Sequence, residues 1–324
     1  MRRTQAEWAR AHRQAGFERY LAIRKTAEQV EEQSTRISYR HQVKAIPAAS
    51  IAITIMRHLG APALQMLYVQ PVLHHLEALV YRGDLESEHN QLTGRLHCDT
   101  SWRTGAEQIL HASGLADSAT LSTLDELQNY FTRETAVMIA RKPVDDDTIR
   151  DLCYQRASHF RLLLRAWHLA LERPYDEAFF RIARHACARF EIVQDLHTYS
   201  DDLADDSFNL LRLEVWQHGT ANARAHLDKL HRNIVRQLRQ ELAEAPRSTL
   251  LAAIRCFLIG HPGRNLTLIP TPLLRRYAYH RLDHALAVTE REAPTPVAEP
   301  TVRGSHSTPS ETAPHLPEDF SRAD

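Results

Sequence analysis

The sequence predicts an all-α protein: one helical domain followed by a disordered tail. Glycine is scarce, with 10 in 324 residues, whereas Leu, Ala, Arg and Glu abound. Few glycines leave few tight turns, and the abundant residues favour helices. No segment alternates apolar and polar residues as a half-buried strand does, and no internal repeat is visible. A chain of this length also buries a substantial core.

Apolar residues recur at helical spacing along most of the chain. Helices are expected at 5–33, 47–59, 63–82, 105–114, 121–141, 147–172, 176–206, 220–244, 247–260 and 271–290. Capping residues support several of them: Asp145–Asp147 suit a helix N-terminus, and Ser122 or Thr123 can cap a helix that begins at Leu124. Pro174 is expected close to the first turn of the helix at 176–206.

Composition divides the chain into three parts. Residues 1–44 are a basic helical segment, 45–291 the all-α domain, and 292–324 a disordered tail that holds six of the 15 prolines. The basic segment is interpreted first as a solvated outer helix. The alternative is a lid or surface helix that meets a membrane or an anionic product, which leaves a peripheral membrane contact open.

Charge and cysteine usage exclude some classes of protein. The formal net charge is zero, so nothing at whole-chain level indicates a nucleic-acid partner. The four cysteines have no CxxC spacing, which is typical of free thiols in a reducing compartment: Cys98, Cys153, Cys187 and Cys256. The N-terminus lacks the apolar part of a secretory signal, and the apolar stretch 45–56 is too short to span a bilayer. We therefore expect a soluble, cytoplasmic protein.

The most informative segment is 194–209, QDLHTYSDDLADDSFN, in which five of sixteen residues are aspartate. On a continuing helix, Asp201, Asp205 and Asn209 form one row at i, i+4 and i+8, and Asp202 lies in a neighbouring row. Oxygen ligands one turn apart fit Mg²⁺, which binds one or two carboxylates together with substrate phosphate. Two alternatives stay open. In the first, the segment is a helix end that runs into solvent, with Asp206 or Ser207 capping the next helix. In the second, the aspartates pair with arginines and form no site.

The 20 histidines suggest a second kind of site, in which a helical bundle binds haem or a metal. The most ligand-like are His74 and His75 beside Glu77, then His185 and the i, i+4 pair His280 and His284. No HExxH or paired ExxH motif is present, so a zinc protease or a di-iron bundle lacks its signature.

Segment 194–209 resembles the second metal-binding motif of class I isoprenoid synthases, the all-α fold of prenyl-chain synthases, squalene and phytoene synthases and terpene cyclases. Gln194, Asp201 and Asp205 keep the spacing of the squalene/phytoene branch. Asp201, Asp205 and Asn209 match the triad of terpene cyclases, and Asp202 is a ligand if DDLAD is the DDxxD motif.

Three residues outside that segment extend the resemblance, which covers roughly 145–285. Arg156 is similar in spacing to the arginine that senses diphosphate in bacterial terpene cyclases, and Arg276 with Tyr277 resembles their diphosphate-closing pair. Arginine suits this role because its planar fork binds two phosphate oxygens. The family's first aspartate-rich motif is not found. The nearest candidates are Glu77, Asp84 and Glu86, or Asp125 and Glu126.

The resemblance implies a single bundle of about nine to eleven helices around a central cavity. It also implies an enzyme that ionises an allylic prenyl diphosphate with Mg²⁺ and then cyclises or couples the product; a homodimer is open. The rival expectation is a non-catalytic all-α interaction protein, such as a degenerate partner subunit of a prenyl synthase. The enzyme requires Asp201 and Asp205 to face a cavity opposite another acidic helix, and the interaction protein requires them on the surface.

Overall fold

The computed structural model describes residues 18, 21, 25, 30, 32–59, 63–258, 266 and 269–297. Throughout these residues the regular structure is helical and no strand is present, so the all-α prediction is confirmed. The expected helix at 5–33 lies almost entirely outside them, as does the tail from 298 onward. No helix in this part of the chain is long and apolar enough to cross a membrane.

The helices run in chain order with short connections. Their bounds are α2 Glu32–Thr35, α3 Tyr39–His58, α4 Ala63–Thr93, α5 Ser101–Ala112, α6 Ser118–Ala140, α7 Asp146–Arg156, α8 Ser158–Ala170, α9 Glu177–Ala204, α10 Leu210–His218, α11 Thr220–Glu244, α12 Arg247–Ala253, the π-helix η1 Ile254–Leu258, and α13 Thr271–Glu292.

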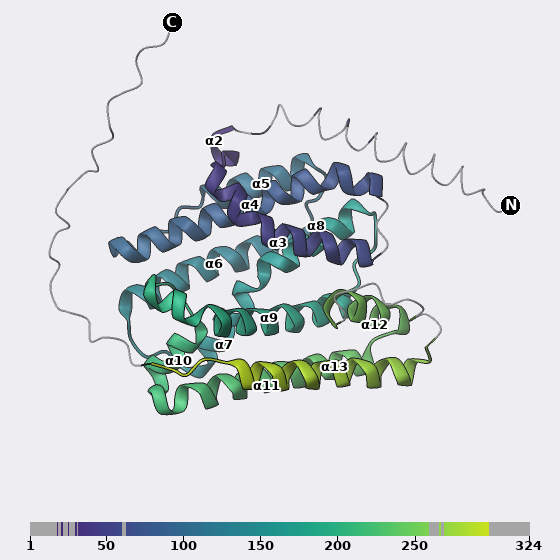
Figure 1. The fold of residues 1–324 in the computed structure, drawn as a ribbon. Helices are drawn as coiled ribbons and strands as arrows, with labels where there is room; N and C mark the ends of the chain where they lie inside the picture. The colour runs from purple at the N-terminus through teal and green to yellow at the C-terminus, as the bar shows by residue number, and fades with distance from the viewer. Residues whose placement is uncertain are drawn as a thin grey trace, which may run out of the picture.

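The helices pack in two groups joined by α9 (Figure 1). The purple and blue helices α2 to α6 pack on one another and on α8. The green helices α10, α11 and α12 pack on α9, and α13 packs on α11. The largest apolar core includes Trp102, Phe131 and Trp167, and a second core lies between α11, α12 and α13. Because α9 contacts both groups, its side chains are the ones best placed to join residues that are distant in sequence.

Helix α4 is longer than the predicted 63–82 and continues to Thr93. Gly83 lies inside it, although glycine costs about 1 kcal/mol in a helix interior. A Cβ atom at Gly83 would lie 2.8 Å from the ring of Trp102, so close packing against α5 requires glycine here. The extension has a functional consequence, because it places Asp84 and Glu88 one turn apart on the same helix.

Several predicted helix ends were wrong, and tertiary contacts or caps explain them. The expected helix 147–172 is two helices, α7 and α8, separated at Ala157. The N-cap of α6 is Asp117 and not Ser122 or Thr123, because the Asp117 carboxylate accepts from the Thr120 amide at 2.9 Å. Pro174 lies in the loop before α9, whose first helical residue is Glu177.

Other local predictions are confirmed. Asp145 caps α7, and its carboxylate accepts from the backbone amide of Thr148 at 2.6 Å. The predicted helix 220–244 coincides with α11. These two features depend on residues within a few positions of one another, so the sequence alone carries the necessary information.

Candidate functional site

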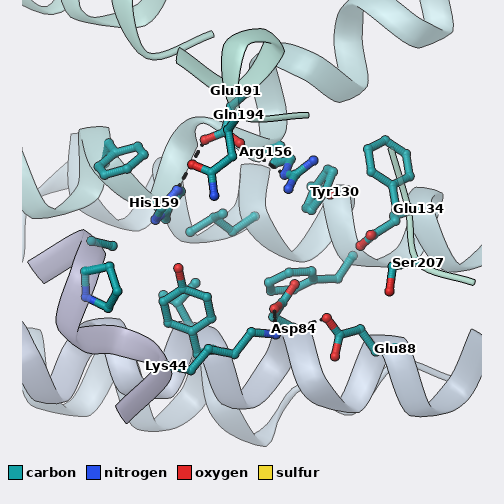
Figure 2. A pocket seen from close by; sticks show the side chains of 18 of the residues that line it. Lys44, Asp84, Glu88, Tyr130, Glu134, Arg156, His159, Glu191, Gln194 and Ser207 are labelled. Carbon is teal, nitrogen blue, oxygen red and sulfur yellow. Dashed lines mark hydrogen bonds and ion pairs between the residues drawn. The ribbon is translucent and has the colours of Figure 1, made fainter. Parts of the chain in front are cut away.

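A charged cavity of about 270 Å³ lies between α3, α4, α6, α7, α8 and α9. Five carboxylates and three basic side chains line it: Asp84, Glu88, Glu134, Glu191, Asp202, Lys44, Arg156 and His159. In Figure 2, Asp84 and Glu88 lie on the opposite side of this cavity from Glu191 and Gln194. The walls also carry aromatic rings, among them Tyr81, Tyr130 and Phe160. Carboxylates therefore outnumber basic side chains in the lining of this cavity.

The α4 wall of the cavity already binds one positive group. The Nζ atom of Lys44 lies 2.7 Å from Asp84 Oδ2 and 3.0 Å from Glu88 Oε1. Burial and the neighbouring Asp84 raise the pKa of Glu88. Two carboxylates one helical turn apart, with an ammonium group held between them, mark a position where positive charge is stabilised.

A chain of five charged residues from four helices runs beside the cavity, and three of them, Arg156, His159 and Glu191, line it. His159 Nδ1 lies 2.7 Å from Glu77 Oε1, and its Nε2 lies 3.4 Å from Glu191 Oε1. Arg156 continues the chain, with Nε at 3.1 Å from Glu191 Oε2 and Nη1 at 2.6 Å from Asp195 Oδ1. We call Glu77, His159, Glu191, Arg156 and Asp195 the charge ladder.

Alternation of sign explains how the charge ladder tolerates burial. Burial alone would lower the pKa of His159, but Glu77 and Glu191 raise it to about 10, so the imidazole carries a proton at neutral pH. Burial opposes ionisation of Glu191, yet Arg156 and His159 hold its pKa below the ordinary value. Burial raises the pKa of Asp195 to about 6 against the effect of Arg156, which leaves this carboxylate mainly ionised at neutral pH.

Glu134 on α6 is the buried carboxyl of the cavity that lacks a full set of partners. It is only 4% exposed, and its Oε2 atom has no hydrogen-bond partner among the residues that the structure describes. Burial, and next the charge of Asp84, raises the pKa of Glu134 to about 8. With this pKa, the Glu134 carboxyl carries a proton at neutral pH. A cation in the cavity would displace that proton and contact Oε2.

Changing Glu134 to Gln is expected to alter the pH dependence of stability. In the folded protein the pKa is about 8, above the unfolded value of 4.5, so the parent loses stability from this group as pH rises from about 4.5 to 8. Glu134→Gln cannot ionise, and its stability relative to the parent should therefore increase over that range. Urea unfolding at pH 5, 6.5 and 8 measures the difference. The exposed Glu177→Gln is the control, and a pH-independent difference for Glu134→Gln would contradict the assignment.

The predicted metal ligands are not arranged as one helical row. Helix α9 ends at Ala204, so Asp205 is its C-cap residue and Asp206 adopts a positive φ of 57°. Asp201 and Asp205 are exposed and do not line the cavity, whereas Asp202 does. Asn209 is fully buried. The predicted row of Asp201, Asp205 and Asn209 requires a helix that continues to Asn209, so it is not formed.

Asn209 and Asp195 instead form the junction between α9 and α10. The side chain of Asn209 caps α10 by accepting from the Leu211 amide at 2.9 Å, and its Nδ2 donates to Asp202 Oδ2 at 2.8 Å. Asp195 Oδ2 accepts from the Leu210 amide at 2.7 Å. The N-cap of α10 is therefore Asn209, and the expected cap at Asp206 or Ser207 was wrong.

Arginine pairing, the other alternative considered for this segment, accounts for two of its aspartates. Asp206 Oδ1 accepts from Arg212 at 2.6 Å, and its Oδ2 pairs with Arg141. Asp195 pairs with Arg156. These two carboxylates are therefore already neutralised by the protein itself.

Of the three predicted diphosphate-binding residues, Arg156 lines the charged cavity. Arg276 and Tyr277 lie on α13 and line neither this cavity nor its apolar neighbour. Arg276 is exposed, and Tyr277 packs against the second apolar core. The structure does not bring the three together, because α13 packs on α11 and α12, away from α4 and α6.

Sequence reasoning named Asp84 as a candidate but missed Glu88, Glu134, His159 and Glu191. The usable signal for Glu88 was its i, i+4 spacing from Asp84. For Glu134 and Glu191 the signal was weaker: each is an acidic residue on the apolar face of its helix, where an unpaired charge is costly. Their convergence needs the packing of α6 and α9 against α4 and could not be derived from spacing.

An apolar cavity of about 240 Å³ adjoins the charged one. The two share Ile51, Phe160 and Phe190 as wall residues. The rest of its lining is mostly apolar and comes from helices α3, α8, α9, α11, α13 and the π-helix, with Arg189 as the charged exception. A charged chamber beside an apolar one suits a ligand with an anionic head, bridged by cations, and a hydrocarbon tail.

No protein-family model, curated protein or solved structure gives a significant match to this chain. The functional argument therefore depends on the geometry of these cavities and on the chemistry of the residues that line them.

Proposed function

We propose that the protein is a class I isoprenoid synthase-like enzyme that ionises an allylic prenyl diphosphate with Mg²⁺. The observation that carries this proposal is the junction of the two cavities at Ile51, Phe160 and Phe190. The charged cavity provides carboxylates on opposing helices, and the apolar cavity provides a dry space for a hydrocarbon chain.

The carboxylates on the α4 side fit Mg²⁺ better than the residues expected from sequence. Asp84, Glu88 and Glu134 offer oxygens at one side of the cavity, and Asp202 lies in its wall. The Lys44 ammonium group lies between Asp84 and Glu88, the position that Mg²⁺ would take. Bound Mg²⁺ would supply charge neutralisation to the leaving diphosphate.

The remaining residues act on the substrate. Lys44, when released from Asp84 and Glu88, can bind phosphate oxygens, and Arg156 adds positive charge at the opposite wall. Positive charge that develops on the hydrocarbon would lie among aromatic faces, including those of Phe160 and Phe190. The apolar walls exclude water and so direct the reaction towards cyclisation or coupling.

A specific observation favours the second candidate, a non-catalytic all-α interaction protein such as a degenerate partner subunit. Asp201 and Asp205 are exposed, and Arg276 is exposed on α13. These are the positions on which the family resemblance depends, and a surface location suits contact with a partner. The charged cavity would then be a structural ion-pair network.

Diphosphate release separates the two candidates. The full chain is incubated with geranyl, farnesyl and geranylgeranyl diphosphates, with Mg²⁺ and with EDTA, and released diphosphate is measured. The enzyme proposal expects Mg²⁺-dependent release with at least one chain length, because the apolar cavity limits the length that fits. If folded protein releases no diphosphate from any of the three, the catalytic proposal is wrong and the interaction protein is favoured.

A further inference from the structure

A second group of polar side chains lies away from both cavities, where α10 meets α7 and α11 (Figure 1). It consists of Asp146 on α7, Glu214 and His218 on α10, and His226 on α11, and we call it the His/carboxylate cluster. Each residue offers one ligand atom, and the four atoms all lie within 4.8 Å of one another. Among the residues that the structure describes, no other such group of three or more ligands is found.

Local structure explains why these residues meet. Glu214 and His218 are one turn apart on α10 and therefore share a face. Gly219 ends α10 with φ 72° and ψ 163°, a conformation that strongly favours glycine, and α11 begins at Thr220. This turn brings His226 back beside His218, and the two rings stack with centroids 3.4 Å apart.

The hydrogen bonds within the cluster leave one buried oxygen unsatisfied. His218 Nε2 lies 2.8 Å from Asp146 Oδ1, which accounts for the single proton that this nitrogen can donate. Glu214 is 3% exposed, and its Oε2 lies 3.5 Å from the same nitrogen. Within the described part of the chain, this oxygen has no hydrogen-bond partner. A salt bridge among these groups therefore does not explain the burial of Glu214, since a buried carboxylate oxygen without a partner is costly.

We propose that the His/carboxylate cluster binds one Zn²⁺ ion. Two imidazole nitrogens and two carboxylate oxygens form a ligand set that zinc accepts, with bonds of about 2.0–2.2 Å in a tetrahedron. Such bonds place ligand atoms about 3.3–3.6 Å apart. The present separations include 2.8 Å between His218 Nε2 and Asp146 Oδ1 and 3.8 Å between His226 Nδ1 and Asp146 Oδ2, and none exceeds 4.8 Å. Binding therefore requires some ligand atoms to move apart and others to move together, by about 1 Å.

The coordination predicts a structural role for the ion. Four protein ligands fill a tetrahedral site and leave no open position for water or substrate. The ligands come from α7 and from the consecutive helices α10 and α11, so the ion would hold α7 to that helix pair. None of the four lines the charged cavity, and the proposal therefore does not depend on prenyl diphosphate chemistry.

The test uses the untagged full chain, stripped with EDTA and dialysed. Zn²⁺ is titrated by calorimetry, and thermal unfolding is followed with and without the ion. We expect one Zn²⁺ per chain and a higher unfolding midpoint. Co²⁺ in place of Zn²⁺ should give the strong visible absorption of tetrahedral cobalt. Binding of more than one ion with no dependence on the cluster would overturn the proposal, as would the absence of binding.

Variants connect binding to these residues. His226→Gln and Glu214→Gln are each expected to weaken Zn²⁺ binding at least about 100-fold, because each removes a ligand. Asp147→Asn, beside Asp146 but paired with Arg150, and the exposed His197→Gln are the controls and should bind as the parent does. Circular dichroism checks that the variants fold, and the half-buried His226 is the safer of the two changes. Equal binding by His226→Gln and the parent would refute the site.

Discussion

Replacing Arg156 by Met is expected to cost about 3–5 kcal/mol of folding stability at pH 7. Arg156 is the cation between Glu191 and Asp195, which are 5% and 0% exposed. Methionine approximates the volume of the arginine stem but leaves Asp195 buried without a counter-charge and Glu191 with His159 as its remaining cation. Urea unfolding at pH 7 measures the loss. The loss should shrink towards pH 5, because protonation of the carboxylates removes the unpaired charge.

Arg150→Met is the matched control for this prediction. Arg150 lies on the same helix and pairs with Asp147 at 2.6 Å, but both side chains are exposed. An exposed pair contributes about 1 kcal/mol or less. If the two variants were equally stable, the charge ladder would not stabilise the fold in the way that its burial indicates.

The double variant Asp84→Asn/Glu88→Gln is expected to reduce Mg²⁺-dependent diphosphate release at least about 100-fold. The two substitutions keep the shape of the side chains but remove the charges that would bind Mg²⁺ against the diphosphate. The two substitutions also leave Lys44 without its carboxylate partners, which is expected to change the folding stability. Thermal unfolding measures that change separately from the rate. The rate is followed as diphosphate released from the substrate that the parent uses best.

Asp201→Asn/Asp205→Asn is the comparison that decides which acidic pair matters. Both residues are exposed and line neither cavity, so this variant should retain the parent rate within a few-fold. The opposite pattern, with release lost in this variant and kept in the Asp84/Glu88 variant, would mean that the resemblance identified the metal ligands correctly and that the cavity did not.

The contrast between the pair Asp84/Glu88 and the pair Asp201/Asp205 shows how much of the site the aspartate-rich segment 194–209 could predict. Segment 194–209 was correctly recognised as unusual, because aspartates one turn apart disfavour a helix. The helix predicted at 176–206 ends at Ala204, so the ligand row, which assumed that the helix continues to Asn209, does not form. The end of α9 depends on Asn209, whose Nδ2 donates to the Asp195 carbonyl at 2.7 Å, and on the buried Asp195, which accepts from Leu210. These contacts join residues 14 and 15 positions apart, beyond the range of helical periodicity.

The break at Ala157 is a second case in which packing overrides local pattern. The run from 147 to 172 carries continuous helical periodicity, yet α7 and α8 are separate helices. Arg156 pairs with Asp195, while His159, three residues on, reaches Glu77 on α4. The carboxylate of each pair is fully buried, and nothing within the segment itself indicates which residues will be the partners of Arg156 and His159.

The sequence by itself determined the all-α class, the bounds of α11, the Asp145 cap and the cluster of acidic residues at 201–206. These features depend on propensities and on spacings of about four residues, which are local in the chain. Only the tertiary structure decided which acidic residues line a cavity. It brought Glu134, His159 and Glu191 to Asp84, and Asp146 to His226, because burial and electrostatic pairing act between helices whatever their separation in sequence.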